Sequence, residues 1–219
     1  MRPGDPVRRG FLALAVGGVF AASGVAHAQE RATLTFSGSG AYVWVRDDGS
    51  APAVQRRGPV LAGEGRVSLR GVTLAASLLE GQLQDVGSSS QRDLVEARVI
   101  VAGRPLPWLE LSVGPVVRAY VADSTTERWV FWQARARVSA PIVATRLSSY
   151  FELWRALSSQ VNLVTAPGRV QGGEAGVVYR PPRGTVWVRL GYRIDDAALR
   201  AVGSETLEAV TFSVGMGEW

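Results

Sequence analysis

Residues 185–195 read TVWVRLGYRID and alternate between apolar and polar side chains. One face carries apolar side chains at every even position from Val186 to Ile194, and the other carries Trp187, Arg189 and Arg193. A period of two is the repeat of a β-strand with one apolar face, whereas a helix repeats every 3.6 residues. The same alternation recurs at 109–121 and 128–140. The pattern therefore predicts an all-β chain.

Weaker alternation elsewhere brings the expected number of strands to ten. Longer polar connections are expected at 47–58, 85–91, 158–171 and 196–204, with 123–127 as a short exception. Along the chain, these longer connections alternate with tight connections at 70–71, 104–108, 141–146 and 181–184. Tight turns join antiparallel neighbours. The strands are expected at 32–46, 59–69, 72–84, 92–103, 109–122, 128–140, 147–157, 172–180, 185–195 and 205–217.

The start of the chain has the layout of a secretory signal peptide. A basic segment precedes the apolar run 11–25, and AHA follows at 26–28 as a cleavage site. The run is short for a spanning helix, which needs ~20 apolar residues, although an uncleaved anchor is the alternative. We expect residues 1–28 to be a signal peptide and residues 29–219 to form one exported domain.

Composition limits the chemistry of the expected mature chain. The only histidine, His27, lies in the signal peptide, and there is no cysteine. The commonest transition-metal ligands and the commonest general base are therefore missing. We expect no enzyme activity, no cofactor and no metal, although an Asp/Glu-only or Ser-only mechanism stays open. The net charge of the whole chain is +5, and it falls to about +3 when Arg2, Arg8, Arg9 and Asp5 leave with the signal peptide. This small and scattered surplus argues against nucleic acid as a partner.

This organisation resembles the small outer-membrane β-barrel proteins of diderm bacteria, as a pattern over the whole mature chain rather than as a unique motif. The chain ends in an aromatic residue, Trp219, as such barrels do. Two, four and six positions before the end, where these barrels carry apolar residues, this chain has Gly217, Gly215 and Ser213. A bulge at either glycine would shift the alternation by one residue and bring apolar side chains back to the expected face. The unequal connections match short periplasmic turns and longer external loops.

The resemblance implies a single antiparallel up-and-down transmembrane β-barrel of about ten strands, with eight as the alternative. It also implies an outer-membrane location. The expected partners are outer-membrane lipid, lipopolysaccharide and, during biogenesis, the barrel-assembly machinery. The oligomeric state stays open.

The polar face of the strands is expected to line the barrel interior. An arginine that faces lipid at mid-bilayer costs ~2 to 4 kcal/mol, so the arginines set which face points inward. A soluble periplasmic barrel would turn its apolar face inward instead. Charges in a narrow lumen are expected to pair with one another. The inward charges are Glu64, Arg66, Glu96, Arg98, Glu110, Arg118, Arg135, Arg137, Glu152, Glu174, Arg180, Arg189 and Arg193.

Aromatic residues near the expected strand ends predict an interfacial girdle, in which Trp and Tyr lie at headgroup level. A stacking site for a sugar or aromatic ligand is the alternative, with the inward Tyr120, Trp154 and Trp187 as candidates. Paired carboxylates at 47–48 and 195–196 are expected in or beside external loops, as solvated charge or as loose divalent-cation sites near lipopolysaccharide rather than as catalytic groups. The girdle residues are Tyr42, Trp44, Trp108, Trp129, Trp132, Tyr179, Tyr192 and Trp219.

These features support three functions. The leading one is a non-enzymatic outer-membrane barrel with a mostly closed Arg/Glu-lined lumen and a structural or surface-interaction role. The second is a narrow pore for small solutes, with a weak preference for anions because inward arginines outnumber glutamates. The third is a soluble periplasmic β-barrel that binds a ligand.

Overall fold

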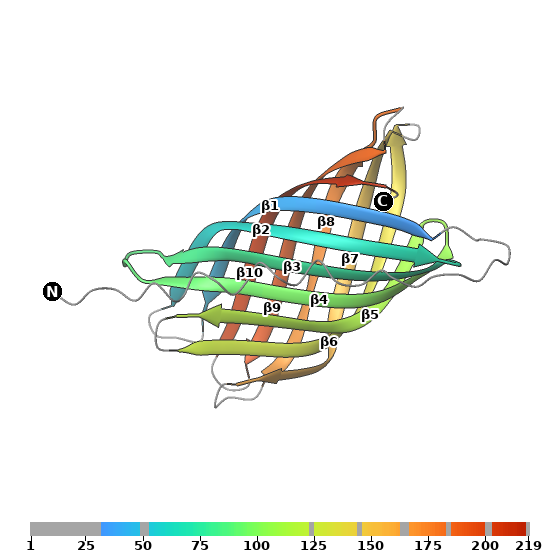
Figure 1. Cartoon of the computed structure of the whole chain (residues 1–219). Helices are drawn as coiled ribbons and strands as arrows, with labels where there is room; N and C mark the ends of the chain where they lie inside the picture. The colour runs from blue at the N-terminus through green and yellow to red at the C-terminus, as the bar shows by residue number, and fades with distance from the viewer. Residues whose placement is uncertain are drawn as a thin grey trace, which may run out of the picture. The chain divides into compact units, whose positions relative to one another are not determined.

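Ten antiparallel strands close into one barrel in the part of the chain that the structure describes (Figure 1). The structure is a computed structural model, and it describes residues 32–48, 53–122, 125–143, 146–162, 167–182, 185–199 and 203–217. The predicted signal peptide and Trp219 lie outside these residues. Each strand pairs with its neighbours in sequence, and β1 also pairs with β10. The predicted up-and-down barrel of ten strands is confirmed, and the eight-stranded alternative is wrong.

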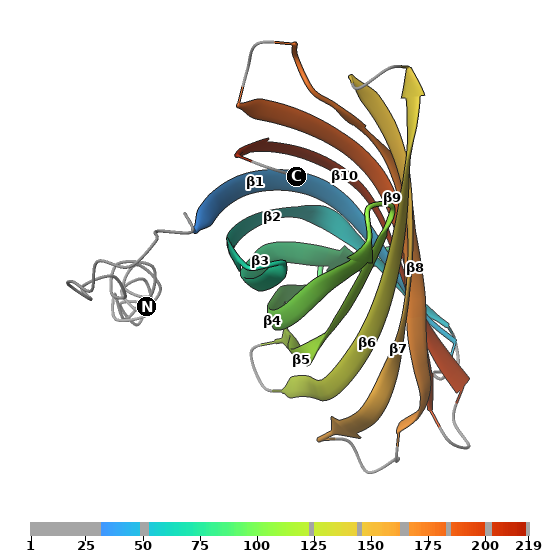
Figure 2. The ribbon, with the colours of Figure 1, turned by 90° about the vertical axis from the view of Figure 1, so that its right-hand side faces the viewer.

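The strands are long. Their bounds are β1 (Thr33–Asp47), β2 (Val54–Leu69), β3 (Val72–Asp85), β4 (Gln91–Leu106), β5 (Leu109–Val121), β6 (Thr126–Val143), β7 (Leu147–Val161), β8 (Pro167–Tyr179), β9 (Val186–Leu199) and β10 (Gly203–Met216). Figure 1 shows the near strands, β1–β6, crossing the far ones at a steep angle, as tilted strands in a closed barrel do. Figure 2 shows the same sheet curving round from β1 to β8.

The two ends of the barrel differ in their connections. We call the end with the β2–β3, β4–β5, β6–β7 and β8–β9 connections the turn end, and the opposite end the loop end. The β2–β3 connection is a two-residue turn in which Arg70 and Gly71 have φ angles of 54° and 79°. Positive φ at both positions defines the type I′ turn, whose twist suits a hairpin.

The long connections predicted at the loop end are partly strand, which corrects the sequence prediction. β2 begins at Val54 rather than at residue 59, β8 begins at Pro167 rather than at 172, and β9 runs to Leu199 rather than 195. In β2, Arg56 and Gly58 pair with Val45 and Val43 of β1. Backbone pairing in the closed sheet extends these strands although their polar residues are typical of loops.

The alternation of side chains reverses along the barrel axis. On β3, the outer residue Leu78 gives way to Gln82 toward the loop end, while the inner residue Ser77 gives way to Leu83. β1 behaves in the same way, since the inner Ser37 is followed by the buried Val43 and Val45. On β3 the outer face is therefore apolar near the turn end and polar near the loop end, and the inner faces of β1 and β3 change from polar to apolar. Other strands differ, since the outer face of β5 stays apolar to Val121 and Arg56 is buried inside near the loop end.

β10 pairs with β1 in unbroken register from Glu205 to Met216, so the bulge considered at Gly215 is absent. A Cβ at Gly215 would collide with the ring of Trp187, which explains the glycine at that position. Gly217 follows with a φ of 96°, a conformation that glycine adopts without strain. Among the described residues there is no helix long and apolar enough to cross a membrane.

Candidate functional site

Four charged side chains form a closed cluster at the centre of the barrel. Arg118 of β5 donates to Glu96 of β4 at 2.6 Å and to Asp195 of β9 at 2.5 Å. Arg193 of β9 donates to the same two carboxylates, at 3.1 Å and 2.5 Å. Each carboxylate thus receives both guanidinium groups. We call Glu96, Arg118, Arg193 and Asp195 the central cluster.

The central cluster spans the interior from wall to wall. β4 and β9 are separated by four strands in either direction round the barrel, so they lie on opposite walls. The bonds from Arg193 to Glu96 and from Arg118 to Asp195 therefore cross the lumen. The side chains of Arg118, Glu96 and Asp195 are only 3–7% exposed. At this level the lumen is filled by protein.

A second group of charges lies on β5, β6 and β7, nearer the turn end. Glu152 accepts from Arg135 and, at 2.8 Å, from Arg137. Arg137 also lies 3.9 Å from Glu110, which accepts from Arg104 at 3.2 Å. Each carboxylate again pairs with two arginines. Charge-assisted bonds of this kind hold buried ions that would otherwise be costly.

A third group lines the remaining wall. Glu64 accepts from Arg66 of the same strand, β2, at 2.6 Å and from Arg98 of β4 at 3.3 Å. On the other side, Glu174 lies 3.5 Å from Arg189 and accepts the hydroxyl of Tyr150 at 2.5 Å. The ring of Tyr150 is also covered by the guanidinium groups of Arg137 and Arg189, at 5.6 Å and 6.0 Å.

The structure brings nearly all of the predicted lumen charges together as ion pairs. Arg180 lies one residue beyond the end of β8 and is exposed at the turn end. Asp195 was missed: the prediction placed it in or beside a loop, whereas it is 2% exposed within β9. Its even spacing from Arg189 and Arg193 was the signal for an inward position.

An apolar layer closes the barrel on the loop-end side of the central cluster. Each of the ten strands contributes at least one buried side chain to it. The layer consists of Val43, Val45, Val60, Leu83, Leu94, Val116, Tyr120, Trp129, Phe131, Trp154, Val170, Ala197, Leu207 and Ala209. These residues pack against one another, so apolar side chains occupy the barrel interior at this level.

The layer corrects one residue of the predicted aromatic girdle. Trp129 is 2% exposed and points inward, where its Nε1 donates to Glu127 at 2.7 Å. It shares the inward face of β6 with Arg135 and Arg137, so the parity of the strand decides its direction. The other girdle residues among those described are exposed on the outer surface: Tyr42, Trp44, Trp108, Trp132, Tyr179 and Tyr192.

The three residues considered for ligand stacking point inward, but they pack against or hydrogen-bond other residues of the barrel interior. Trp154 stacks on Phe131 with ring centroids 5.7 Å apart, and its Nε1 donates to Asp195 at 3.1 Å. Tyr120 donates its hydroxyl to Glu205 at 2.7 Å. With Trp187, these rings are at most 6% exposed. None of the three presents an accessible ring face to a ligand.

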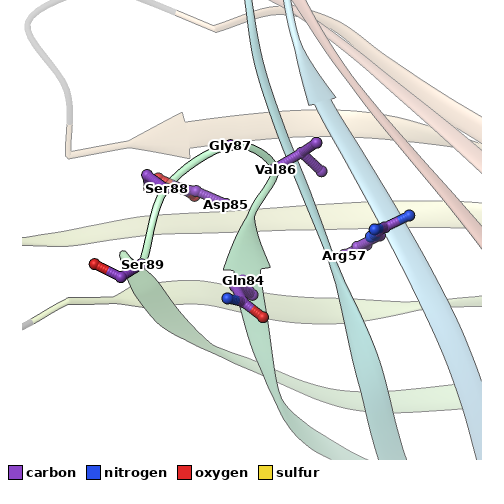
Figure 3. Close-up of a pocket in the computed structure, with 7 residues that line it drawn as sticks. All are labelled: Arg57, Gln84, Asp85, Val86, Gly87, Ser88 and Ser89. Atoms are coloured by element: carbon purple, nitrogen blue, oxygen red, sulfur yellow. The ribbon is translucent and has the colours of Figure 1, made fainter.

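Among the described residues, hollows open at both ends of the barrel. At the loop end, a hollow of about 530 Å³ lies between β2 and the β3–β4 connection (Figure 3). Arg57 of β2 lines it together with Gln84 at the end of β3 and Ser88 of the β3–β4 connection. At the turn end, a cavity of about 320 Å³ lies in the mouth of the barrel and is lined by Arg104, Arg180 and others. The described residues contain no group of three or more metal-ligating side chains.

Comparison with known proteins gives matches among solved structures alone. No protein-family model and no curated protein sequence matches the chain. The translocator domain of the autotransporter NalP from Neisseria meningitidis is 12% identical, with 85% of this chain and 88% of that one covered and a TM-score of 0.50. Neisserial surface protein A is 11% identical, with 86% of this chain and 100% of that one covered and a TM-score of 0.41. The β-domain of the Bordetella autotransporter BrkA is 12% identical, with coverages of 84% and 99% and a TM-score of 0.40. The likeness to the NalP translocator domain, with the closed antiparallel sheet, shows that this chain has the fold of the bacterial outer-membrane β-barrels.

Proposed function

We propose that the protein is an integral outer-membrane barrel with a sealed lumen, and that it acts as a structural or surface-interaction protein rather than as a pore. The observation that carries the proposal is the apolar layer to which every strand contributes. It lies beside a central cluster of ion pairs that crosses the lumen. An ion that passed through would have to break both.

The outer surface supports a membrane position nearer the turn end. Leu34, Phe36, Leu74 and Phe212 are among the large apolar side chains exposed there. A strand of ~9 to 11 residues spans a bilayer when tilted, whereas β5 has 13 residues and β6 has 18. The surplus forms the loop-end part of the barrel, which contains the apolar layer and carries outer polar residues such as Gln82 on β3. We propose that this part projects into water from the outer leaflet, beside lipopolysaccharide.

The projecting part is where a surface role would act. It carries its own apolar core, so it stays rigid outside the bilayer. Export by the signal peptide at 1–28 and insertion by the barrel-assembly machinery belong to the same proposal. The exposed apolar surface nearer the turn end argues against a soluble periplasmic barrel, because soluble monomers rarely expose apolar patches of more than a few hundred Å².

A narrow anion pore is the second candidate. Arginines outnumber carboxylates around Glu64, Glu152 and Glu174, each of which has at least one arginine partner. A pore would need the apolar layer to open, because apolar constrictions block ions by excluding water.

Conductance in a planar bilayer tests the sealed lumen. The purified protein is expected to show no steady current, because the layer is packed. Replacing Trp129 and Phe131 together with serine removes two rings from the layer and should raise the conductance. Trp132→Ser is the matched control, since Trp132 lies on the outer face of the same strand. A steady anion-selective current through the unmodified protein would refute the proposal in favour of the pore.

A further inference from the structure

A groove crosses the outer face of the barrel near the loop end. Its main part is a hollow of about 600 Å³ over β9, β10, β1 and β2, with Trp44, Tyr192 and Glu208 in its lining. It continues into the hollow of Figure 3, because Arg57 and Val86 line both. We call the two hollows together the outer groove. Sites for small molecules have volumes of ~300 to 1,000 Å³, so the main part alone is large enough for one.

The outer groove lies where the outer face of the sheet changes from apolar to polar. On β10 the outward side chains change from Phe212 and Val210 to Glu208 toward the loop end. On β1, next to it, they change from Phe36 to Arg46. The apolar band of an outer-membrane barrel meets the hydrocarbon of the bilayer. In the outer-membrane position proposed above, the outer groove therefore lies at the level of the headgroups of the outer leaflet.

Aromatic side chains gather in and beside the groove. Tyr42 and Trp44 belong to β1 and Tyr192 belongs to β9, the two strands that flank β10. Their side chains are 39–44% exposed. The rings of Tyr42 and Trp44 lie 4.8 Å apart between centroids. The groove therefore offers accessible apolar ring surface, which the inward rings of Tyr120 and Trp154 do not.

Charged groups lie on either side of the Trp44 ring. Trp44 pairs in register with Arg57 of β2 and with Glu208 of β10. Residues that pair in this way have Cβ atoms about 4.5 to 5.5 Å apart and project from the same face of the sheet. A guanidinium, an indole and a carboxylate therefore stand side by side, held by the backbone of the closed sheet.

These charged groups remain available to a ligand. Arg57 is exposed, and it forms no ion pair with any residue that the structure describes. Glu208 accepts one hydrogen bond, at 2.9 Å from the hydroxyl of Tyr192 to its Oε2. Arg46, which also lines the groove, is 61% exposed and contacts the exposed Asp48 at 2.7 Å. Exposed ion pairs of this kind are weak, so a phosphate can compete for Arg46.

We propose that the outer groove binds the phosphorylated sugar headgroup of lipopolysaccharide. Arg57 and Arg46 bind phosphate oxygens, because a planar guanidinium donates two parallel hydrogen bonds to phosphate. Trp44 packs against the apolar face of a sugar ring, and Glu208 accepts from a sugar hydroxyl. A phospholipid carries the phosphate but has no sugar ring for Trp44. The site rests on the proposed outer-membrane position, but it does not depend on the sealed lumen.

Native mass spectrometry of the folded protein in detergent tests this binding with three probes: lipid A, lipid A without its phosphates, and phosphatidylglycerol. We expect lipid A to bind most tightly. Arg57→Gln should weaken its binding about tenfold, as loss of a charge-assisted bond does. Trp44→Ala should weaken it about two- to tenfold through loss of the ring contact. Removal of the phosphates should abolish the effect of Arg57→Gln and leave that of Trp44→Ala.

Arg128→Gln is the matched control, because Arg128 is exposed on the outer face of β6 at the same end but does not line the groove. It should leave binding unchanged. Slower migration after heating shows that each variant is folded, and Arg46→Gln tests the site if Arg57→Gln fails to fold. Absence of lipid A binding, equally tight binding of phosphatidylglycerol, or equal weakening by Arg128→Gln would overturn the proposal.

The membrane position is tested separately from the groove. If Gln82→Cys in vesicles fails to react with a water-soluble maleimide, the proposed projection of the loop end is wrong. If it reacts but lipid A does not bind, the groove proposal alone is refuted. A conducting barrel would refute the sealed lumen without affecting a site on the outer face.

Discussion

Removing the carboxylate of Asp195 is expected to destabilise the barrel more than any change to a neighbouring surface charge. Asp195 accepts from Arg118 and Arg193, both at 2.5 Å, and from Trp154 at 3.1 Å. In Asp195→Ala all three donors lose an acceptor at a position where the side chain is 3% exposed. Glu96 then remains as the only carboxylate between two guanidinium groups.

The size of the effect follows from these contacts. A hydrogen bond to a charged group contributes about 1.5 to 3 kcal/mol. Four such bonds are lost, three from the two arginines and one from Trp154. Rearrangement and entry of water recover part of that loss, and breaking one side of a buried ion pair costs about 3 to 5 kcal/mol in measured cases. We therefore expect Asp195→Ala to lower the free energy of unfolding by about 3 to 5 kcal/mol.

Asp196→Ala is the matched control, because Asp196 is the next residue and lies on the outer face of β9. A surface substitution of this kind changes stability by about 0.5 kcal/mol or less. The assay is urea unfolding of the protein refolded into lipid vesicles, followed by tryptophan fluorescence. Equal effects of the two substitutions would show that the central cluster contributes no stability, and would refute the reasoning.

Three further predictions follow from the same structure. Gly114→Ala should prevent correct folding, because its Cβ would overlap a carbonyl oxygen of β4, whereas Gly38→Ala, with open space around it, should be tolerated on heat-modified gels. The chain has no cysteine, so single cysteines can map the membrane: Gln82→Cys should react with a water-soluble maleimide in vesicles and Leu74→Cys should not. N-terminal sequencing of the envelope protein should begin at Gln29, and an intact leader would contradict the predicted cleavage.

The strand number and the inward face could be predicted because they depend on a local pattern. Arg189 and Arg193 alternate with Val188 and Leu190, and a shift of one residue would expose arginine to lipid. The lumen charges follow from the same parity. Arg180 lies outside β8, because the end of that strand is set by its pairing with β7 and β9. This pairing stops at Tyr179.

The partners of the charges could not be predicted from the sequence. Arg118 and Asp195 are 77 residues apart, and their contact depends on β5 and β9 facing each other across a closed barrel. Trp129 shows a different limit. The girdle is predicted from the position of aromatic residues near the expected strand ends, although the alternation of Arg135 and Arg137 on the same strand places Trp129 inside. The alternation of side chains along a strand is a stronger criterion than nearness to a strand end, because the alternation follows from backbone geometry.

The reversal of alternation connects these results. In the sequence, the outer positions of β3 change from Leu78 to Gln82 while the inner ones change from Ser77 to Leu83. A uniform membrane barrel has no reason for this change, and neither does a uniform soluble one. A barrel whose turn-end part meets lipid and whose loop-end part meets water requires it, because each part buries its apolar residues on the side away from water. The inner apolar residues that this reversal places near the loop end belong to the apolar layer. The strand segments that we propose to extend beyond the bilayer therefore also supply the side chains that close the lumen.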